Sequence, residues 1–383
     1  MADAYVYEAS RTAIGRRGGA LSKMRPDELA AANLKAMVEK AGIDAGEIED
    51  VIMGCVTQVG EQGMNIGRTA ALIAGFPITV TGTTVNRMCG SSLQTINFAA
   101  QAVMSGMQDL VVGAGVESMS RVQMGSDVAP LSEGLTDRFD IINQGLSAEL
   151  IAKKWGHRRE ELDAFALESH RRALMAIDEG YFAREIGAVE VEGEEGPVEF
   201  KVDEGPRRGS TAEKLAGLKP AFREDGVITA ASSSQISDGA AAVLIGSREV
   251  GERLGKVPRA KFRATAVAGV DPTIMLTGPI PVTRKVLKKA GLKLSDIELF
   301  EVNEAFAPVV LAWADEMEED REKLLARTNV NGGAIALGHP LGCSGARLLT
   351  TLLHEMERRD LTLGLATLCI GFGQAVATVI ERV

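Results

Sequence analysis

The amino-acid sequence predicts an α/β protein of two related halves, with a different kind of segment inserted between them. The first half contains a strand, a tight turn at Met88-Cys89-Gly90, a helix and a second strand in succession. The same succession recurs near the C-terminus, where Gly342-Cys343-Ser344-Gly345 begins a helix. Between the halves, residues 119–223 are richer in charge, Gly, Pro and Ser. Strands alternating with helices are typical of a sheet covered by helices.

Length and composition restrict the class of molecule. A chain of 383 residues corresponds to two or three domains at roughly 100 to 200 residues each. Hydrophobic residues make up 45% and charged residues 25%, which is typical of a packed globular protein and excludes a disordered or fibrous one. The formal charge of −10 argues against nucleic acid as the main partner. An anionic small molecule stays compatible with it, because its binding needs only a few cations.

Cysteine usage and apolar runs indicate a cytoplasmic protein without a membrane span. The four cysteines form no CxxC pair, which is typical of a reducing compartment: Cys55, Cys89, Cys343 and Cys369. Charged residues interrupt the first eleven positions, so no signal-peptide core is expected. The most apolar long stretch, residues 361–380, contains polar residues and glycines and is interpreted as buried strands.

The elements of the first half follow from apolar spacing, caps and turns. In order we expect a strand at 4–8, a polar loop at 11–19, a helix at 26–41, a strand at 50–55, a helix at 68–74, a strand at 83–87, a helix from Ser91 or Ser92 to about 107, and a strand at 109–113.

The second half and the insertion are predicted in the same way. The second half should hold a strand at 297–302, a helix from the 342–345 turn to about 358, and strands at 363–368 and 374–381. The insertion shows one clear helix, at 158–179, and an acidic, glycine-broken stretch at 190–206 that is interpreted as a loop. Loops over a rigid core are where ligand contacts concentrate.

Cys89 is the first candidate catalytic residue. It lies where a strand ends and a helix begins, and the helix N-terminus is expected to favour its thiolate. A buried cysteine of the core is the alternative, but a core position does not need the polar turn formed by Asn86, Arg87 and Ser91.

His339 and two segments at strand ends are further candidates. His339 lies in a glycine-rich bend before Pro340 and is expected to be a general base, whereas the three other histidines are expected to be exposed. Asn303 follows a strand and can orient a water or a base. The glycines after Cys369 can leave backbone N–H groups free to point at an oxyanion.

These residues carry a family resemblance. VNRMCGSS around Cys89, NEAFA from Asn303, GHPLGCSGAR around His339 and CIGFG from Cys369 resemble the four signature blocks of the thiolases. ISDGAAAVL from Ile236 and EKLAGLKPAF from Glu213 resemble further family segments, so the resemblance covers essentially the whole chain. Within the family, the chain is most similar to the degradative bacterial 3-ketoacyl-CoA thiolases of fatty acid β-oxidation.

The resemblance implies a role for each candidate. Cys89 would be the nucleophile that accepts the acyl group as a thioester, and His339 would accept its proton. Cys369 would protonate the carbon of the departing acetyl-CoA enolate. Asn303, through a water, and His339 would stabilise the enolate oxygen. The backbone N–H of Gly371, with that of Cys89, would hold the tetrahedral oxyanion.

The resemblance also implies contacts with coenzyme A and the acyl chain. The matching positions, which are expected to bind substrate, are Arg207, Ser234, Lys214, Gln144, Phe222, Ala305 and Phe372. Lys214 stands where some relatives have a serine, and it is interpreted equally well as a solvated surface lysine. Coenzyme A and its esters are expected as substrates, with no separate cofactor and no metal.

Two departures from the family pattern concern the acyl pocket. Asn143-Gln144 precede Gly145 where relatives that handle acetoacetyl-CoA carry His-Met, and Phe372 replaces a glycine of the common CxGGG block. Both departures favour longer acyl chains. The alternative within the family is a biosynthetic acetyl-CoA acetyltransferase that condenses two acetyl-CoA molecules.

Three other classes of protein compete with this interpretation. A decarboxylating condensing enzyme pairs its cysteine with two histidines or with a histidine and an asparagine, and lacks a second catalytic cysteine. A non-catalytic CoA-ester binding protein would tolerate loss of Cys89, His339 or Cys369, all of which are present. A papain-like hydrolase has Cys, His and Asn but no counterpart of Cys369.

The resemblance implies three parts of the chain and an assembly. An N-terminal thiolase domain is expected at 1–118, completed by about 236–256, with a loop domain for CoA at 119–235 and a C-terminal thiolase domain at 257–383. Two similar βα domains would pack in layers beneath the loop domain. A homodimer or homotetramer is expected, and a complex with a hydratase–dehydrogenase subunit is left open.

Overall fold

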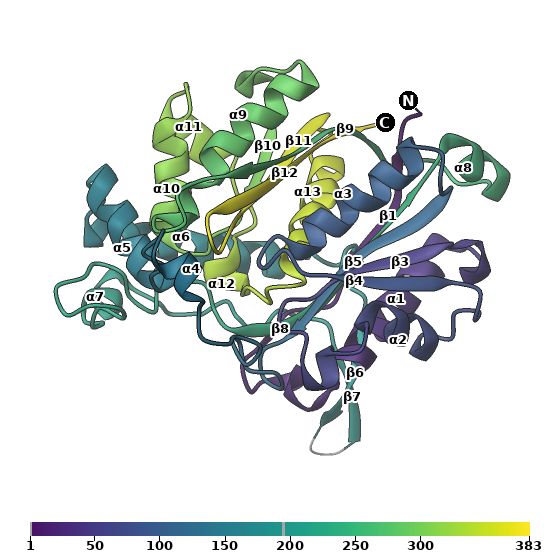
Figure 1. The fold of residues 1–383 in the computed structure, drawn as a ribbon, viewed down its shortest axis with the longest axis horizontal. Coiled ribbons are helices and arrows are strands. Elements are labelled where there is room, and N and C mark those ends of the chain that lie inside the picture. The colour runs from purple at the N-terminus through teal and green to yellow at the C-terminus, as the bar shows by residue number, and fades with distance from the viewer. Residues whose placement is uncertain (1, 194–195) are drawn as a thin grey trace.

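The computed structural model, which describes residues 2–193 and 196–383, contains one ten-stranded mixed sheet (Figure 1). Within these residues its two halves, called the first and the second sheet below, are joined only through β1 (Tyr5–Arg11) and β9 (Ala260–Gly269). The junction is short, since it pairs Tyr5 with Lys261 and Val6 with Ala260. In spatial order the strands are β10 (Leu299–Val302), β11 (Leu363–Ile370), β12 (Gln374–Arg382), β9, β1, β8 (Ser237–Gly246), β5 (Leu110–Ser118), β3 (Asp50–Gly54) and β4 (Thr81–Val85).

The two halves repeat one pairing pattern. In the first half β3 and β5 are parallel, and β8 and β1 follow as antiparallel neighbours. In the second half β10 and β11 are parallel, and β12 and β9 follow in the same sense. The predicted α/β fold with two related halves is confirmed, and β4 is an additional strand at the free side of the first sheet.

Two helices form the layer between the sheets. These are α3 (Ser91–Met104) and α13 (Ser344–Arg358), and their apolar faces share one core with strands of both halves. Their first turns touch: the Ser92 hydroxyl accepts a hydrogen bond from the Ala346 N–H at 2.9 Å. A Cβ at Gly345 would stand 2.2 Å from the Leu93 nitrogen, so only glycine allows this approach. The contact brings the turn that carries Cys89 close to the turn that begins α13.

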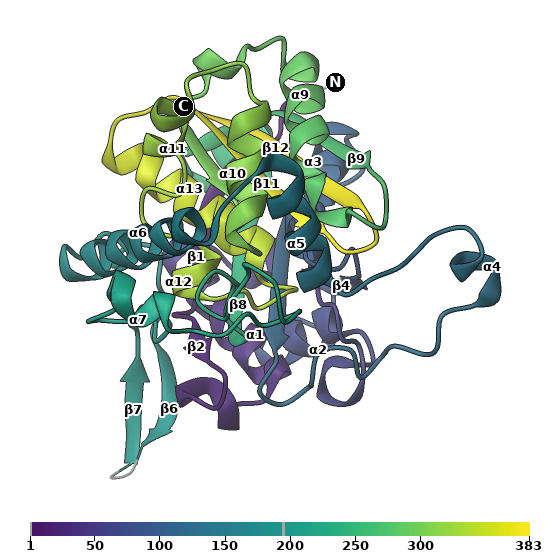
Figure 2. The same cartoon turned by 90° about the vertical axis from the view of Figure 1, so that its left-hand side faces the viewer.

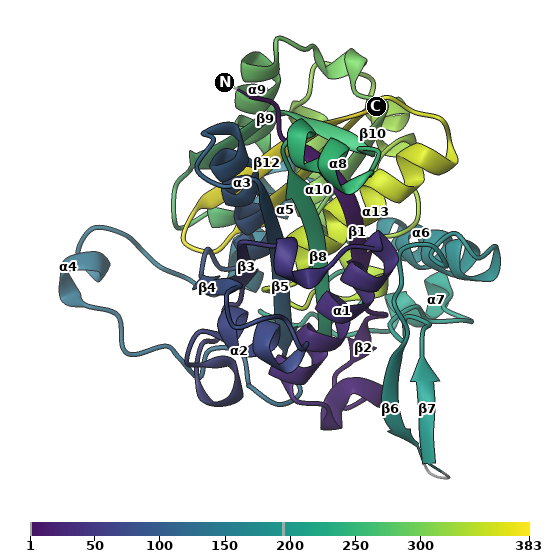
Figure 3. The ribbon, with the colours of Figure 1, turned by 90° about the vertical axis from the view of Figure 1, so that its right-hand side faces the viewer.

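Other helices cover the outer faces of the sheets (Figures 1 and 3). The helices α1 (Pro26–Ala41) and α2 (Ile66–Ile73) cover the first half, where Leu29, Leu34 and Met37 pack on the sheet. The helices α9 (Pro279–Ala290) and α10 (Ala307–Glu316) cover the second half, with Trp313 fully buried. Each fully buried large apolar side chain contributes about 1.5–3 kcal/mol.

The inserted segment contains more regular structure than predicted (Figure 2). Besides α6 (Arg159–Asp178) it holds α4 (Glu133–Thr136), α5 (Gln144–Trp155) and α7 (Ala212–Ala216). The prediction of one clear helix was therefore wrong. The helix α5 begins where the Asn143 side chain accepts the Gly145 N–H and ends at Gly156, whose φ is 72°.

The acidic stretch at 190–206 that was predicted as a loop lies partly in two paired strands, while its residues 194–195 lie outside the described residues. Strands β6 (Val189–Gly193) and β7 (Gly196–Phe200) pair antiparallel and project from the body of the protein (Figure 2). In β6 the buried Val189 and Val191 alternate with exposed glutamates. That alternation is a strand pattern, which the acidity of the stretch had concealed.

The other predicted elements agree with the observed ones to within a few residues, whereas the strands β8 and β9 and the helices α9 and α10 were not predicted. The helix α3 ends at Met104, three residues before its expected end, and β5 continues to Ser118 beyond its expected end at 113. A two-residue strand, β2 (Gly15–Arg16), pairs with β8 inside the expected loop. Short helices complete the described residues: α8 (Arg248–Leu254), α11 (Arg321–Ala326) and α12 (Ala334–Leu337).

A buried charge cluster joins the inserted segment to β1. Arg11 is fully buried and donates to Glu185 at 2.6 Å and to both carboxylate oxygens of Asp203 at 2.7 and 2.9 Å. Because three buried charges satisfy one another, removing Arg11 would leave two carboxylates uncompensated, which costs about 3–5 kcal/mol in comparable cases. Across residues 2–193 and 196–383, no helix has both the length and the apolar character of a membrane span.

Candidate active site

The turn that carries Cys89 is held by its neighbours. Met88 has a φ of 45°, a left-handed conformation that is costly for a non-glycine residue. The Ser91 hydroxyl donates to the Met88 carbonyl at 2.6 Å and accepts from the Arg87 N–H at 2.9 Å. Ser91 therefore fixes the turn, and the predicted helix cap at Ser91 or Ser92 is corrected to Gly90.

Cys89 is a thiol in the resting site. Its side chain is 4% exposed, and burial raises its pKa to about 11. The backbone N–H groups of Gly371 and of Cys89 itself act in the opposite direction, but burial dominates. The expected thiolate at the helix N-terminus is thus wrong for the resting state, and Cys89 needs a base to become a nucleophile.

Cys369 lies beside Cys89 at the end of β11. It is fully buried, and burial together with the neighbouring Cys89 holds its pKa well above the ordinary value of a thiol. A Cβ at Gly371 would stand 3.1 Å from both the Gln144 Nε2 and the Met88 Sδ. The absence of a side chain at Gly371 therefore leaves its N–H free to face the Cys89 sulfur.

The hydrogen bonds of His339 fix its tautomer. The Ser344 hydroxyl donates its only hydrogen to the Pro340 carbonyl at 2.8 Å, because a carbonyl oxygen can only accept. Ser344 Oγ must therefore accept the hydrogen of His339 Nδ1, at 2.5 Å. That leaves Nε2 with its lone pair, 3.3 Å from the Asn303 side-chain nitrogen.

Burial keeps His339 neutral as well. The side chain is 4% exposed, and burial, followed by the positive charge of Arg347, lowers its pKa to about 3. A neutral imidazole that carries a lone pair on Nε2, here an acceptor for the Asn303 side-chain N–H, is what a general base requires. Sequence reasoning found His339 but missed Ser344, although a hydroxyl five positions after the histidine, at a helix start, was the available signal.

The side-chain oxygen of Asn303 is an unused hydrogen-bond acceptor in the residue that contacts His339. This oxygen, Oδ1, is buried and finds no hydrogen-bond partner among the residues that the structure describes. A buried acceptor of this kind suits a bound water. The site thus contains the oxygen that the predicted role of Asn303 needs.

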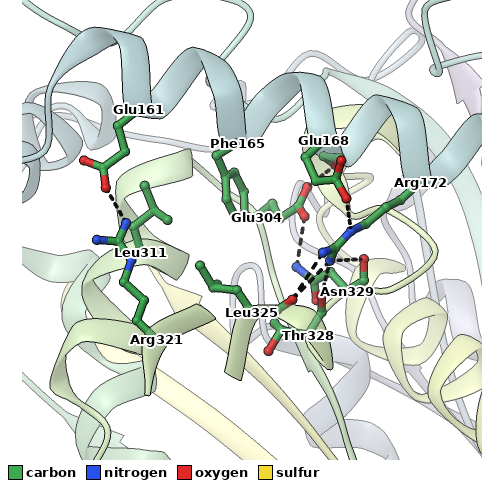
Figure 4. A pocket seen from close by; sticks show the side chains of 11 residues that line it. Glu161, Phe165, Glu168, Arg172, Glu304, Leu311, Arg321, Leu325, Thr328 and Asn329 are labelled. Atoms are coloured by element: carbon green, nitrogen blue, oxygen red, sulfur yellow. Dashed lines mark hydrogen bonds and ion pairs between the residues drawn. The ribbon is translucent and has the colours of Figure 1, made fainter. Parts of the chain in front are cut away.

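The backbone at Asn303 is anchored by the next residue, Glu304. Its carboxylate accepts from the Ser169 hydroxyl at 2.6 Å, from the Asn329 side chain at 3.0 Å and from the Ile335 N–H at 3.2 Å. Glu304 lies at a cavity of about 260 Å³ between α6, α10 and α11, with the Glu161–Arg321 ion pair on another wall (Figure 4). None of the predicted site residues lines this cavity.

Two of the predicted substrate contacts line another cavity. Arg207 and Lys214 border a space of about 320 Å³, together with His170 and Gln235. The Lys214 ammonium donates to the Gly209 carbonyl at 2.7 Å, so it has a local partner without a ligand. Two cations at one cavity can attract a phosphate-bearing ligand.

Gln235, which sequence reasoning missed, connects this cavity to the histidine. Its side-chain nitrogen donates to the carbonyls of Gly205, Ile335 and Ala336, and its backbone carbonyl accepts the backbone N–H of His339 at 3.0 Å. The residue therefore spans from the Arg207 cavity to the catalytic loop. Its place directly after Ser234 was the only sequence signal.

The other predicted substrate contacts surround the catalytic turns. The Ser234 N–H donates to the Ala305 carbonyl at 3.0 Å, which places these two residues together. Phe222 packs its ring on Phe306, 5.8 Å between centroids, and against Gly145 beside Gln144. Phe372 adopts a φ of 60° next to Gly371, and 37% of its surface is exposed.

Three histidines that were expected to be exposed are buried. His157 contacts Asp315 at 2.8 Å, His170 accepts the Arg207 N–H at 3.2 Å, and His354 donates to the Ala9 carbonyl at 3.1 Å. Each partner lies on another element, so the charged neighbours of each histidine in the sequence did not reveal its burial.

The fold and the site define a protein of two repeated α/β halves with a cysteine–histidine centre and a second buried thiol. The thiolase N-terminal domain model matches residues 4–249 and the thiolase C-terminal domain model matches residues 256–382. The chain belongs to the thiolase family.

Individual relatives match over the full chain. A steroid 3-ketoacyl-CoA thiolase of Mycobacterium tuberculosis is 47% identical, with 100% of this chain and 95% of the relative covered. A 3-ketoacyl-CoA thiolase of Idiomarina loihiensis is 46% identical, with 100% of both chains covered. The crystal structure of the Bacillus anthracis acetyl-CoA acetyltransferase matches with a TM-score of 0.92 and 41% identity, covering 100% of this chain and 99% of the other.

Proposed function

We propose that the protein cleaves 3-ketoacyl-CoA with coenzyme A to acetyl-CoA and an acyl-CoA shortened by two carbons. The observation that carries the proposal is the buried pair Cys89 and Cys369, with the Gly371 N–H acting on the Cys89 sulfur and His339 as a neutral base. Two full-length relatives carry the name 3-ketoacyl-CoA thiolase, which supports this direction of the reaction.

The first half-reaction breaks the carbon–carbon bond. His339 Nε2 takes the proton of Cys89, and the sulfur attacks the 3-keto carbon of the substrate. The N–H groups of Cys89 and Gly371 stabilise the resulting oxyanion, a contribution worth about 2.7–4 kcal/mol per donor in other enzymes. Collapse expels the enolate of acetyl-CoA, which Cys369 protonates at carbon, and leaves an acyl thioester on Cys89.

The second half-reaction releases the shortened acyl group. The proton that His339 took from Cys89 passes to the Cys369 thiolate, and the neutral His339 then takes the proton of the incoming coenzyme A. The coenzyme A sulfur attacks the acyl thioester, and Cys89 leaves as a thiolate that regains a proton from His339. The water that Asn303 Oδ1 can hold and the His339 Nε2–H would stabilise the enolate oxygen in the first half-reaction.

Substitutions of the two cysteines should impair different steps of the reaction. Cys369→Ala should still take an acyl group from an acyl-CoA onto Cys89, but lose α-proton exchange of acetyl-CoA and thiolysis by ~10²-fold or more. Cys89→Ala should lose acyl transfer while it still binds CoA esters, and Cys343→Ala serves as a buried control thiol. Acyl mass on the Cys343 or Cys55 peptide, or proton exchange at the parent rate in Cys369→Ala, would disprove the two-cysteine mechanism.

Arg207, with Lys214 and Ser234, would bind coenzyme A. Arg207→Ala should raise KM for CoA esters more than it lowers kcat, because the contact is common to ground and transition states. Arg223→Ala is the matched control, since Arg223 is an exposed arginine paired with Asp225 at 2.6 Å. An unchanged KM in Arg207→Ala would remove Arg207 from the site.

The alternative, condensation of two acetyl-CoA molecules, is favoured by the name of the Bacillus anthracis structure. Gln144 and Phe372 at the catalytic turns argue for longer acyl chains. Thiolysis rates measured from four-carbon to sixteen-carbon substrates separate the two activities. A preference confined to the four-carbon substrate would support the acetyltransferase.

The proposal includes self-association into a homodimer or homotetramer. The strand β4 pairs on one side only, and exposed apolar side chains lie in the segments beside it: Met64, Ile73 and Ile78. Such an edge favours pairing with another chain. Light scattering of the purified protein gives the mass, and a monomer at micromolar concentration would contradict the assembly.

A further inference from the structure

Glu117 is a buried carboxylate at the end of β5, outside the set of residues assigned above. Its side chain is fully buried. One oxygen accepts from the Val56 N–H at 2.9 Å and the Gly342 N–H at 2.8 Å. The other accepts from the Thr57 N–H at 3.1 Å and the Gln62 side chain at 2.7 Å.

The four donors require an ionised carboxylate. Each oxygen accepts two hydrogen bonds, so a proton on either oxygen would displace a donor. Lysine and arginine side chains form no ion pair with Glu117 within the described ranges 2–193 and 196–383. Four fixed N–H dipoles therefore balance the buried negative charge, although burial raises the pKa of the carboxyl.

The donors belong to segments that converge on the nucleophile. Val56 and Thr57 follow β3 in the first half, and Gly342 lies in the second half, three residues after His339. A Cβ at Gly342 would stand 2.4 Å from the Val116 carbonyl, so the histidine loop rests directly on β5. Glu117 thus ties the loop of the base to the sheet of the nucleophile's half.

The same segments supply the apolar contacts of Cys89. Cys89 packs in a small cluster with Met119 and Leu341, and Val56 packs against it. Val56 is itself a Glu117 donor, Leu341 precedes Gly342, and Met119 lies two residues after Glu117. Any shift of the carboxylate would displace this apolar wall around the sulfur.

We propose that Glu117 is a positioning residue that sets the distance between His339 and Cys89 and keeps a negative charge beside the nucleophile. The proposal rests on the proposed thiolase function and adds a residue to its machinery. The charge acts in the same sense as burial, because it opposes ionisation of Cys89 before a base arrives.

The variant Glu117→Gln tests the charge. An amide of the same shape removes the anion and turns an acceptor into a donor that faces N–H groups. Alkylation of Cys89 by iodoacetamide, followed by mass spectrometry without any CoA ester, should then reach its plateau at lower pH, with roughly threefold or greater acceleration at pH 8. Turnover should fall ~10-fold or more, with KM for CoA esters changed by less than about twofold.

Two further variants separate positioning from loss of stability. Glu149→Gln is the matched control, because Glu149 is a buried glutamate that accepts the Val227 and Ile228 N–H groups at 2.9 Å each. It should reduce thermal stability but leave the alkylation profile unchanged. Glu117→Asp keeps the negative charge but has a shorter side chain that cannot hold all four donors in the same positions. It should therefore lower kcat and leave the pH profile of Cys89 alkylation unchanged.

The outcomes are distinct from those that test the reaction itself. A parent-like alkylation profile and kcat in Glu117→Gln would overturn the proposal, and so would an equal shift in Glu149→Gln. If Glu117→Gln does not fold, parent-like kcat in Glu117→Asp overturns the proposal by itself. A parent protein without thiolysis would contradict the proposed function, while its alkylation profile would still report on Glu117.

Discussion

At the scale of single residues, the protonation of His339 depends on one hydroxyl. Ser344→Ala removes the acceptor of the Nδ1–H, so the imidazole can exchange its tautomer and present a hydrogen from Nε2 to Cys89. We expect turnover to fall ~10-fold, with KM for CoA esters little changed, which is less than the ~10²–10⁴-fold loss of a missing general base because His339 itself stays in place.

Nitrogen-15 NMR of histidine-labelled protein checks this directly. The chain has four histidines, so the spectrum is simple enough to assign with a His339→Gln variant. The parent should show its hydrogen on Nδ1, and Ser344→Ala should show a mixture. Ser247→Ala, which removes a helix-capping hydroxyl at α8, is the control. A parent with the hydrogen on Nε2 would contradict the assignment.

The second residue-scale prediction concerns the reactivity of Cys89. With a pKa of about 11, only a small fraction of Cys89 is thiolate near neutral pH. In the free enzyme, alkylation of Cys89 by iodoacetamide should therefore rise roughly tenfold per pH unit between about pH 7 and 9. An alkylation rate that has already reached its plateau at pH 7 would show that Cys89 and a histidine form a stable thiolate–imidazolium pair.

The sequence supplied the candidate residues of this site but not their protonation states. Motif resemblance identified Cys89, His339, Asn303 and Cys369, because the family preserves residue types at fixed spacing. The protonation of Cys89 depends on burial by segments from both halves, and the tautomer of His339 depends on the direction of one Ser344 hydrogen. Neither property is encoded in spacing along the chain.

At the scale of elements, the turn between β11 and β12 fixes the Gly371 N–H. Gly373 has a φ of 75°, and a Cβ there would stand 2.4 Å from the Val270 carbonyl. Gly373→Ala should therefore destabilise the protein by about 2–4 kcal/mol, from backbone strain and the clash together. Thiolysis should fall as well, because the displaced turn carries Gly371.

Gly269→Ala is the matched control for that prediction. Gly269 lies opposite Gln374, and a Cβ there would meet only the Gly373 carbonyl, at 3.9 Å. Urea denaturation and steady-state kinetics of both variants give the comparison. Equal stability of Gly373→Ala and Gly269→Ala would show that the turn relaxes without cost.

Elements with clear local signals were the predictable ones. The apolar spacing of α1, α6 and α13 gave their positions to within one or two residues. The helix α5 was missed because Ser, Gly and charged residues surround its short buried face of Ala148, Ile151 and Ala152. The paired strands β6 and β7 were missed because many of their side chains are exposed, and glutamates occupy several of these exposed positions.

At the scale of the whole molecule, buried histidines make stability depend on pH. Burial lowers the pKa of His170 to about 4, of His339 to about 3 and of His354 to about 2, against 6.5 in the unfolded chain. Below pH 6.5 the unfolded chain binds protons that the folded one does not, so the free energy of unfolding falls as pH falls. Glu301, whose pKa burial raises to about 8, acts in the opposite direction between 4.5 and 8.

His354→Gln tests this linkage. Glutamine can keep a hydrogen bond to the Ala9 carbonyl but has no proton to bind in the unfolded chain. Between about pH 6 and 5, the loss of unfolding free energy per pH unit should become smaller by about 1 kcal/mol, somewhat below the limit of 1.4 per proton. Urea midpoints at several pH values measure it, and an unchanged slope would show that His354 is protonated in the fold.

The pairing of β1 has a consequence for synthesis of the chain. Tyr5 pairs with Gly246 and Lys261, so both neighbours of the first strand are made about 240 to 255 residues later. Because translation proceeds at roughly 5–20 residues per second, the partner strands of β1 are synthesised on the order of 12–50 s after β1 itself. The charge partners of Arg11, Glu185 and Asp203, are also synthesised late, 174 and 192 residues after it. The apolar first strand is thus exposed throughout most of translation, and substitutions that weaken β8 or β9 should reduce the yield of folded protein before they affect the finished enzyme.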